Sequence, residues 1–429
     1  MTFAIGALIL VLLIMLAIPI GFGLALAGIG SLTMLMPFEN ISSLISPVIH
    51  RTTANSILLP IPMFVLMAEF LAAGGVAQDL LLACNRLMHR IRGGMAMACI
   101  LAGTIHAAAT GSSTASAASL ARASFPAMMK AGYAPSFAVG TIAIAGTLAV
   151  MIPPSIAFVL YGIMTGTSIG KLFVAGIVPG LLTAVGYLLT ISVVLLRRPE
   201  LGPKRAEGVN PATEAATASS NGQVWPMVVL IVVIIGGLYT GIATPTEISA
   251  IGALGALLIS LYCGRMSWHG FFDAIGGTMR ITSMIILIMI GAHIFGYFIS
   301  VSRFTSEILA LINQSGWAPT TVMLTVVLVY LALGTVMDQA AIIILTAPIT
   351  TELMVQLGYD PVWWGIIMIK TAEIGLVTPP LGIVTFVVSS TTRTNLRSNF
   401  VGVLPYVVTE MILLAILLAF PQISLFLTQ

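Results

Sequence analysis

The stretch GYAPSFAVGTIAIAGTLAVMIPP at residues 132–154 has a counterpart in GYDPVWWGIIMIKTAEIGLVTPP at residues 358–380. The Gly-Tyr-x-Pro starts and the Pro-Pro ends share one offset, 358 − 132 = 226 residues, and Pro19 and Pro245 share it too. Landmarks that recur at one spacing without gaps indicate an internal repeat. Each stretch is mostly apolar up to its proline pair. Because proline removes a backbone donor, each stretch predicts a membrane helix that is broken at the prolines.

The composition of the chain excludes a water-soluble fold. Apolar residues make up 59% of the 429 residues and charged residues only 7%, whereas soluble domains carry about 25% charged residues. About ten apolar runs approach the roughly 20 residues that span a bilayer. In lipid the backbone must satisfy its own hydrogen bonds, so these runs predict helices, and no alternating β-barrel segments are visible. We therefore expect an all-α polytopic membrane protein. Its basic residues sit in short loops and indicate no nucleic-acid partner.

The repeat divides the chain into two halves joined by a hydrophilic stretch. In the first half, residues 1–196, we expect scaffold helices at 1–92, a hairpin at 94–130 and a broken helix at 136–165. Residues 197–224 are rich in Ala, Ser, Thr, Glu and Pro, which predicts a flexible linker. In the second half, residues 225–429, we expect scaffold helices at 225–299, a hairpin at 318–356, a broken helix at 362–390 and a last helix at 400–428. We expect the run at 225–240 to lie outside the repeat.

The distribution of basic residues predicts that the two halves are inverted relative to each other. Arg86 and Arg92 precede the segment 94–130 and Lys130 ends it, so the positive-inside rule puts both ends and the later linker in the cytoplasm. The segment is therefore expected to be a re-entrant hairpin. Its counterpart at 318–356 has few basic residues and is expected on the opposite side. Inverted repeats with broken helices are typical of secondary transporters.

A first cation site is expected between the hairpin tip and the helix break of the first half. The tip offers serine hydroxyls, and the break frees carbonyl groups from their helical partners. Such oxygens suit a hard cation such as Na⁺. The alternative is that the serines only cap the second helix of the hairpin. The expected ligands are Gly111, Ser112, Ser113, Gly146, Ala149 and Met151.

A second cation site is expected between the equivalent tip and break of the second half. An ionisable side chain inside a membrane segment costs roughly 2.5–3.5 kcal/mol, so Asp338 is expected to bind a cation or to carry a proton. The alternative is that Asp338 only caps a helix. Glu373 could belong to this ion site or act as a gate. The other expected ligands are Gln339, Gly375 and Thr378.

Candidate substrate contacts flank the same tips and breaks. Half-helix N-termini suit a carboxylate, and Lys370 is expected to be the counter-charge of an anionic substrate. The alternative is a simple pair between Lys370 and Glu373, three residues apart on one helical face. The other expected contacts are Thr114, Pro154, Pro380 and Thr385.

Other polar and aromatic residues are expected to be structural. Glu69, Glu247 and His106 are expected to form hydrogen bonds at helix interfaces. Three of the five tryptophans are expected in the interfacial aromatic belt; they are Trp317, Trp363 and Trp364.

Other chemistries find little support in the motifs. Gly111-x-Ser113 lacks the second glycine of GxSxG, and neither HExxH nor a Gly-rich GK[ST] loop occurs. We therefore expect no enzyme and no ATP-driven pump on this chain. A channel is the alternative function, because re-entrant hairpins also line pores. The two tips differ in sequence, which fits a coupled transporter better.

Several motifs together resemble one known family. They are Ile152-Pro153-Pro154-Ser155-Ile156, Ser168-Ile169-Gly170-Lys171-Leu172-Phe173-Val174-Ala175-Gly176-Ile177-Val178-Pro179-Gly180, the Met337-Asp338 tip, and Glu373-Ile374-Gly375-Leu376-Val377-Thr378-Pro379-Pro380. Over essentially its whole length the chain is similar to the large membrane subunit (DctM-like) of TRAP transporters, in the ion transporter superfamily.

The resemblance implies Na⁺-coupled import of an organic acid across the bacterial inner membrane, with two or more Na⁺ sites. It implies an elevator-type movement of a transport domain against a scaffold. It also implies two partners, a small four-helix membrane subunit and a periplasmic substrate-binding protein. The substrate would be a C4-dicarboxylate or a bulkier acid of the sialic acid type. Many members carry Asn where this chain has Val384, which leaves room for the bulkier acid.

Overall fold

Prolines and glycines mark the ends of the helices in the computed structural model. It describes residues 2–16, 18–88, 90–203, 224–302 and 316–428, with single positions 307, 310 and 314. Proline stands in the first turn of helices such as those starting at Pro135 and Pro361, where its missing N–H costs nothing. The described residues form helices and no strand. The predicted all-α fold class is confirmed.

The first half contains ten α-helices and two short 3₁₀ turns among its described residues. In chain order they are α1 (Thr2–Met15), α2 (Ile20–Leu32), α3 (Phe38–Thr53), η1 (Ser56–Leu58), α4 (Pro60–Ala73), α5 (Val76–Met88), α6 (Gly94–Thr110), α7 (Ser113–Lys130), α8 (Pro135–Met151), α9 (Ile156–Thr165), α10 (Ile169–Arg197) and η2 (Pro199–Leu201). The expected linker lies outside the described residues from position 204 to 223.

The second half follows the first at the offset found in the sequence. Its described helices are α12 (Trp225–Tyr239), α13 (Pro245–Tyr262), α14 (Trp268–Val301), α16 (Pro319–Gly334), α17 (Gln339–Gln356), α18 (Pro361–Val377), α19 (Ile383–Thr392), α20 (Leu396–Ala419) and α21 (Gln422–Leu425). Helices α7 and α17, and likewise α8 and α18, begin and end 226 residues apart, as 339 − 113 = 226 and 361 − 135 = 226.

The helix bounds correct one sequence prediction and shift another. The run at 225–240 was expected outside the repeat, but α12 is the counterpart of α1. The turn at Pro19 separates α1 from α2 as the turn before Pro245 separates α12 from α13. The last helix begins earlier than 400 because Asn395 caps it, and it ends at Ala419, before Pro421.

The helices pack in two groups. In one group α2 and α4 pack on α14, and α13 packs on α4. In the other group α6, α7 and α20 surround α8, and α16, α17 and α20 contact α18. Helices α8 and α18 touch each other, and α8 with α9 is 94% buried over its apolar window. The broken helices therefore form the centre of the second group.

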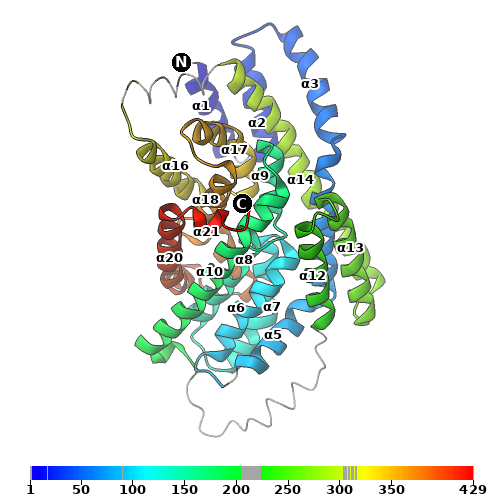
Figure 1. Cartoon of the computed structure of the whole chain (residues 1–429), viewed down its shortest axis with the longest axis vertical. Coiled ribbons are helices and arrows are strands. Elements are labelled where there is room, and N and C mark those ends of the chain that lie inside the picture. The colour runs from blue at the N-terminus through cyan, green and yellow to red at the C-terminus, as the bar shows by residue number, and fades with distance from the viewer. Residues whose placement is uncertain are drawn as a thin grey trace.

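The two hairpins enter the molecule from opposite ends. Figure 1 shows α6 and α7 towards the lower end of the long axis and α16 and α17 towards the upper end. Seven helices of the described residues are long and apolar enough to span a membrane, and the hairpin arms α6 and α16 are among the shorter apolar helices. This arrangement is that of a polytopic membrane protein built from two inverted repeats.

Two of the three tryptophans that were predicted to lie in the aromatic belt are buried instead. Trp363 and Trp364 are only 2% and 0% exposed, and the Trp363 indole donates a hydrogen bond to the Leu417 carbonyl at 3.1 Å. They lie on α18, which is buried on all sides, so the prediction of an interfacial position was wrong for both. Trp317 is 53% exposed.

Candidate functional site

The first hairpin tip is fastened to the first helix break. Gly111 ends α6 with a φ of 58°, a left-handed conformation that favours glycine. Its carbonyl accepts a hydrogen bond from the amide of Ile156 at 3.3 Å. A Cβ atom on Gly111 would lie 2.9 Å from the Pro154 carbonyl oxygen. The tip and the break therefore meet through backbone atoms, with no room for a side chain at Gly111.

The Ser112 hydroxyl does not cap the helix that follows it. Ser112 stands at the N-cap position of α7 but makes no side-chain capping bond. Its Oγ instead lies 3.4 Å from the hydroxyl of Thr114. The capping alternative therefore does not describe Ser112, and its oxygen remains available to a ligand.

The second tip has a different chemistry. Asp338 is the N-cap of α17, and its carboxylate accepts a hydrogen bond from the Ala340 amide at 3.0 Å. The structure thus shows the capping role, which leaves the second carboxylate oxygen for other partners. The amide of Leu381, in the second break, donates to the carbonyl of Thr335 at 3.3 Å. Tip and break are linked in this half as well.

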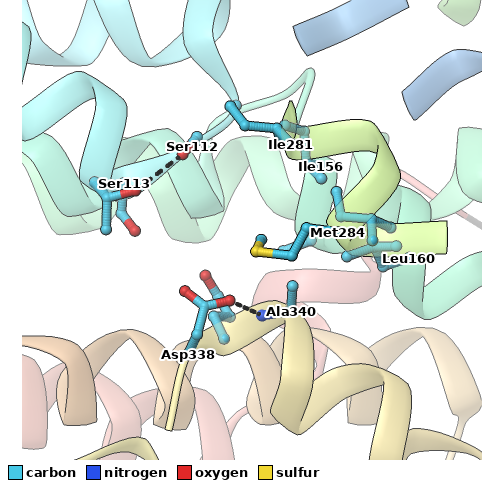
Figure 2. Close-up of a pocket in the computed structure, with 13 residues that line it drawn as sticks. Ser112, Ser113, Ile156, Leu160, Ile281, Met284, Asp338 and Ala340 are labelled. Atoms are coloured by element: carbon cyan, nitrogen blue, oxygen red, sulfur yellow. Dashed lines mark hydrogen bonds between the residues drawn. The ribbon is translucent and has the colours of Figure 1, made fainter. Parts of the chain in front are cut away.

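Both tips line a single cavity of about 130 Å³. Figure 2 shows the Asp338 carboxylate pointing towards the tip that carries Ser112 and Ser113, with Met284 of α14 beside the gap. The sequence placed the two tips in separate sites, and only the fold brings them together. The lining residues are Gly111, Ser112, Ser113, Thr114, Ile156, Ala157, Leu160, Ile281, Met284, Ile285, Asp338, Gln339 and Ala340.

Several of the buried polar atoms without a hydrogen-bond partner belong to the first hairpin and its break. They include the Ser155 hydroxyl beside the tip, the Ser116 hydroxyl on α7 and both ring nitrogens of His106 on α6. The interface hydrogen bond expected of His106 is therefore not seen among the described residues. Buried polar groups are normally paired, so these atoms are exceptions, and none of the three residues lines the shared cavity. No group of three His, Cys, Asp or Glu side chains capable of holding a metal occurs in the described ranges. A cation here would rely on hydroxyl and carbonyl oxygens.

The remaining candidate residues do not line this cavity. Gly146 packs against Ala117, where α7 and α8 cross. The Met151 carbonyl lies against α10, near Gly176. The Thr378 hydroxyl donates to the Ile374 carbonyl at 2.6 Å. The other candidates outside the lining are Ala149, Pro154, Lys370, Gly375, Pro380 and Thr385.

Lys370 pairs with two carboxylates rather than facing the cavity. Its ammonium lies 3.1 Å from Glu373 and 2.6 Å from Glu410, and it donates to the Thr183 hydroxyl at 3.0 Å. Tyr187 donates to Glu410. The pairing alternative therefore describes Lys370, because its ammonium forms ion pairs with both carboxylates and its side chain is 0% exposed.

Sequence reasoning missed Glu410 as the second ion-pair partner of Lys370. The signal was present, since a carboxylate in an apolar helix such as α20 needs a partner in the membrane. Glu247 was misplaced: instead of joining a helix interface, it accepts a hydrogen bond from the Thr244 amide at 2.7 Å in the capping box of α13.

Two inverted halves with broken helices, whose hairpin tips share one cavity, define a polytopic membrane transporter. The comparisons with known proteins give the family. The profile of the tripartite ATP-independent periplasmic transporter, DctM component, matches residues 7–423. This chain therefore belongs to the DctM family of TRAP transporter large permeases.

Relatives with similar sequences carry names of permeases for small organic acids. The chain is 34% identical to the C4-dicarboxylate TRAP transporter large permease DctM of Pseudomonas aeruginosa over 397 residues, 92% of each chain. It is 31% identical to the 2,3-diketo-L-gulonate large permease YiaN of Escherichia coli over 85% of each chain. It is 33% identical to the isethionate permease DctMQ of Oleidesulfovibrio alaskensis over 86% of this chain and 58% of that longer protein.

One solved structure shares the fold. The YdaH transporter of Alcanivorax borkumensis superposes with a TM-score of 0.66 over 90% of each chain, at 14% identity. The likeness concerns the fold alone.

Proposed function

We propose that this chain is the permease of a Na⁺-coupled transporter that imports an organic acid received from a periplasmic binding protein. The observation that supports the proposal is the shared cavity, where the tips of two inverted hairpins meet. A site formed equally by both halves can open to either side when the halves exchange their conformations. The expected location is the bacterial inner membrane.

The cavity suits a small organic anion. Helices α7 and α17 both begin at its wall, with Ser113 and Gln339 as their first residues. Helix N-termini carry partial positive charge and unpaired N–H groups that bind carboxylates. The similar permeases are named for a C4-dicarboxylate, a keto sugar acid and isethionate. We therefore propose an organic acid, in the range from a C4-dicarboxylate to a bulkier sialic acid-type anion.

The proposal of coupling to Na⁺ is supported by oxygen donors beside that anion site. The Ser112 hydroxyl at the first tip caps no helix, and the buried hydroxyl of Ser155 lies at the break behind it. Asp338 supplies a carboxylate at the second tip. Hydroxyl and carboxylate oxygens suit a hard cation, and a cation there offsets the charge of the incoming acid. We propose one Na⁺ at each tip.

An elevator-type movement is proposed from the two packing groups. The wall formed by Met284 belongs to α14 of the first group, whereas both tips belong to the second. The two breaks also differ in their surroundings: Pro153 and Pro154 are buried, and Pro379 and Pro380 are exposed. The two equivalent breaks therefore have unequal surroundings, as expected if this structure is one of two alternating conformations. The second group of helices would slide along the first group to pass from one conformation to the other.

Two partners complete the proposal. The family is described as tripartite and periplasmic, and the longer relative carries the name DctMQ. We propose a separate small four-helix membrane subunit and a periplasmic substrate-binding protein.

The decisive experiment is uptake into liposomes. The complex of this chain with its small subunit and loaded binding protein should accumulate labelled acid only with an inward Na⁺ gradient. Equal accumulation in Na⁺-free buffer would refute the coupling. Flux that runs only downhill and needs no binding protein would select the channel alternative instead.

A further inference from the structure

A second and larger concavity lies between α10 and α20, away from the hairpin tips. Its volume is about 710 Å³, within the range of sites that enclose a substantial ligand. Most of its lining is aliphatic, and its floor is formed where small residues let the helices approach: a Cβ on Gly186 would touch Thr409 at 3.1 Å. The lining residues are Ser136, Phe137, Gly186, Leu189, Thr190, Val193, Val194, Arg197, Arg198, Leu201, Val401, Gly402, Leu404, Pro405, Val408, Thr409, Ile412 and Leu413.

The two helices run antiparallel along this groove. Gly186 lies against Leu413, far from the end of α10. Towards that end, the Ala134 amide donates to the Leu201 carbonyl at 3.1 Å, and Gly402 lies against Ser136. The C-terminal end of α10 therefore lies beside the N-terminal end of α20.

Both walls of the groove end in arginine at this same end. On α10 the lining positions recur at helical spacing up to Arg197, with Arg198 directly after it. On α20 the stripe through Val401, Pro405, Val408 and Ile412 extends back one turn to Arg397, since residues four apart share a helix face. Both helices are long enough to span a membrane. A cationic end thus closes an otherwise apolar groove at the edge of the spanning segment.

The threonine hydroxyls in the groove are hydrogen-bonded within the protein and do not need a polar ligand. One of the Thr190 and Thr409 hydroxyls donates to the other at 2.5 Å, and the hydroxyl that accepts this bond donates to a carbonyl of its own helix. The arginines, by contrast, have no ion-pair partner among the described residues, where the ion pairs involve other groups. The carboxylate nearest in sequence to Arg197 and Arg198 belongs to the exposed Glu200, which does not line the groove.

We propose that this groove binds one anionic phospholipid, with an acyl chain between α10 and α20 and the phosphate at Arg197, Arg198 and Arg397. Basic pockets between membrane helices bind anionic head groups, and each arginine near the head-group region contributes about 1 kcal/mol, which is about fivefold in affinity. An aliphatic groove that ends in cations matches a molecule with an apolar tail and an anionic head. The inference rests on this geometry and does not depend on the proposed function.

Native mass spectrometry of the purified chain in detergent tests the proposal. Titration with phosphatidylglycerol and with phosphatidylcholine of the same acyl chains should show one tightly held phosphatidylglycerol and no equivalent phosphatidylcholine. Arg197→Gln with Arg397→Gln should weaken that one site by about fivefold for each arginine removed. Lys171→Gln is the matched control, because Lys171 is an exposed cation near the opposite end of α10.

A second pair of variants tests the apolar part of the groove. Val193→Trp should fill the groove and remove the bound lipid, whereas Leu181→Trp should not, because Leu181 is similarly exposed on α10 but does not line it. Size-exclusion profiles establish that each variant is folded. Equal binding of the two lipids by the wild type, unchanged binding by Val193→Trp, displacement by inorganic phosphate alone, or displacement by the small subunit would each overturn the proposal.

Discussion

The backbone of Gly111 is hydrogen-bonded to the backbone of Ile156, so the tip of the first hairpin is held against the break of the following helix. The contact joins two broken elements whose unpaired groups would otherwise be costly in a membrane. It also places Thr114 and Ile156 on the same cavity wall.

The glycine at this tip should be essential for transport. Gly111→Ala should abolish uptake, because its Cβ would lie 2.9 Å from the Pro154 carbonyl. Gly166→Ala is the matched control: its φ of 70° carries a similar backbone strain of about 1–2 kcal/mol, but no atom lies within 4 Å of its added Cβ. Uptake by the two variants in liposomes checks this, and equal loss in both would show that strain alone is responsible.

Removing the Ser112 hydroxyl should affect ion use rather than folding. Since the hydroxyl makes no capping bond, Ser112→Ala should change stability by less than about 0.5 kcal/mol. Uptake should fall at low Na⁺ and recover in part at high Na⁺, because one cation ligand is lost. Thermal unfolding and the Na⁺ dependence of uptake are the measurements. Glu69→Gln serves as the control and should retain uptake; an unchanged Na⁺ dependence in Ser112→Ala would count against the first cation site.

The charge of Asp338 can be separated from its capping role. Asn is as good an N-cap as Asp, so Asp338→Asn should keep the bond to the Ala340 amide and the stability of α17. Uptake should nevertheless be lost, because the neutral amide binds a cation poorly. Asp338→Ala should lose uptake and also about 1 kcal/mol of stability. Normal uptake by Asp338→Asn would mean that this residue is only a cap.

The buried cluster around Lys370 should matter through its charge balance. Lys370→Met leaves Glu373 and Glu410 buried without a counter-charge, and breaking a buried pair in this way costs about 3–5 kcal/mol. Replacing both carboxylates by Gln in the same variant should restore most of that stability. Thermal unfolding in detergent measures both effects, and Lys171→Met, at an exposed lysine of α10, should change little. If Lys370→Met were as stable as the wild type, the cluster would be unimportant for folding.

Much of the fold could be read from local signals. The broken helices α8 and α18 follow from apolar runs that end in Pro-Pro, and the hairpin tips follow from polar residues in the middle of apolar segments. These signals act within one or two turns of chain, through missing backbone donors and the cost of exposing polar groups to lipid. They were enough to predict an all-α membrane transporter and its family, both of which the structure and the relatives confirm.

The sequence alone determined which segments span, break or turn back, because those outcomes depend on neighbouring residues. Tertiary structure decided what meets what: that Ser112 and Asp338 share one cavity, that Lys370 is neutralised by Glu410 on another helix, and that Trp363 is enclosed by protein. Those pairings arise from side-chain packing between helices that are far apart in the chain, and no local pattern encodes which face of a buried helix will meet which neighbour.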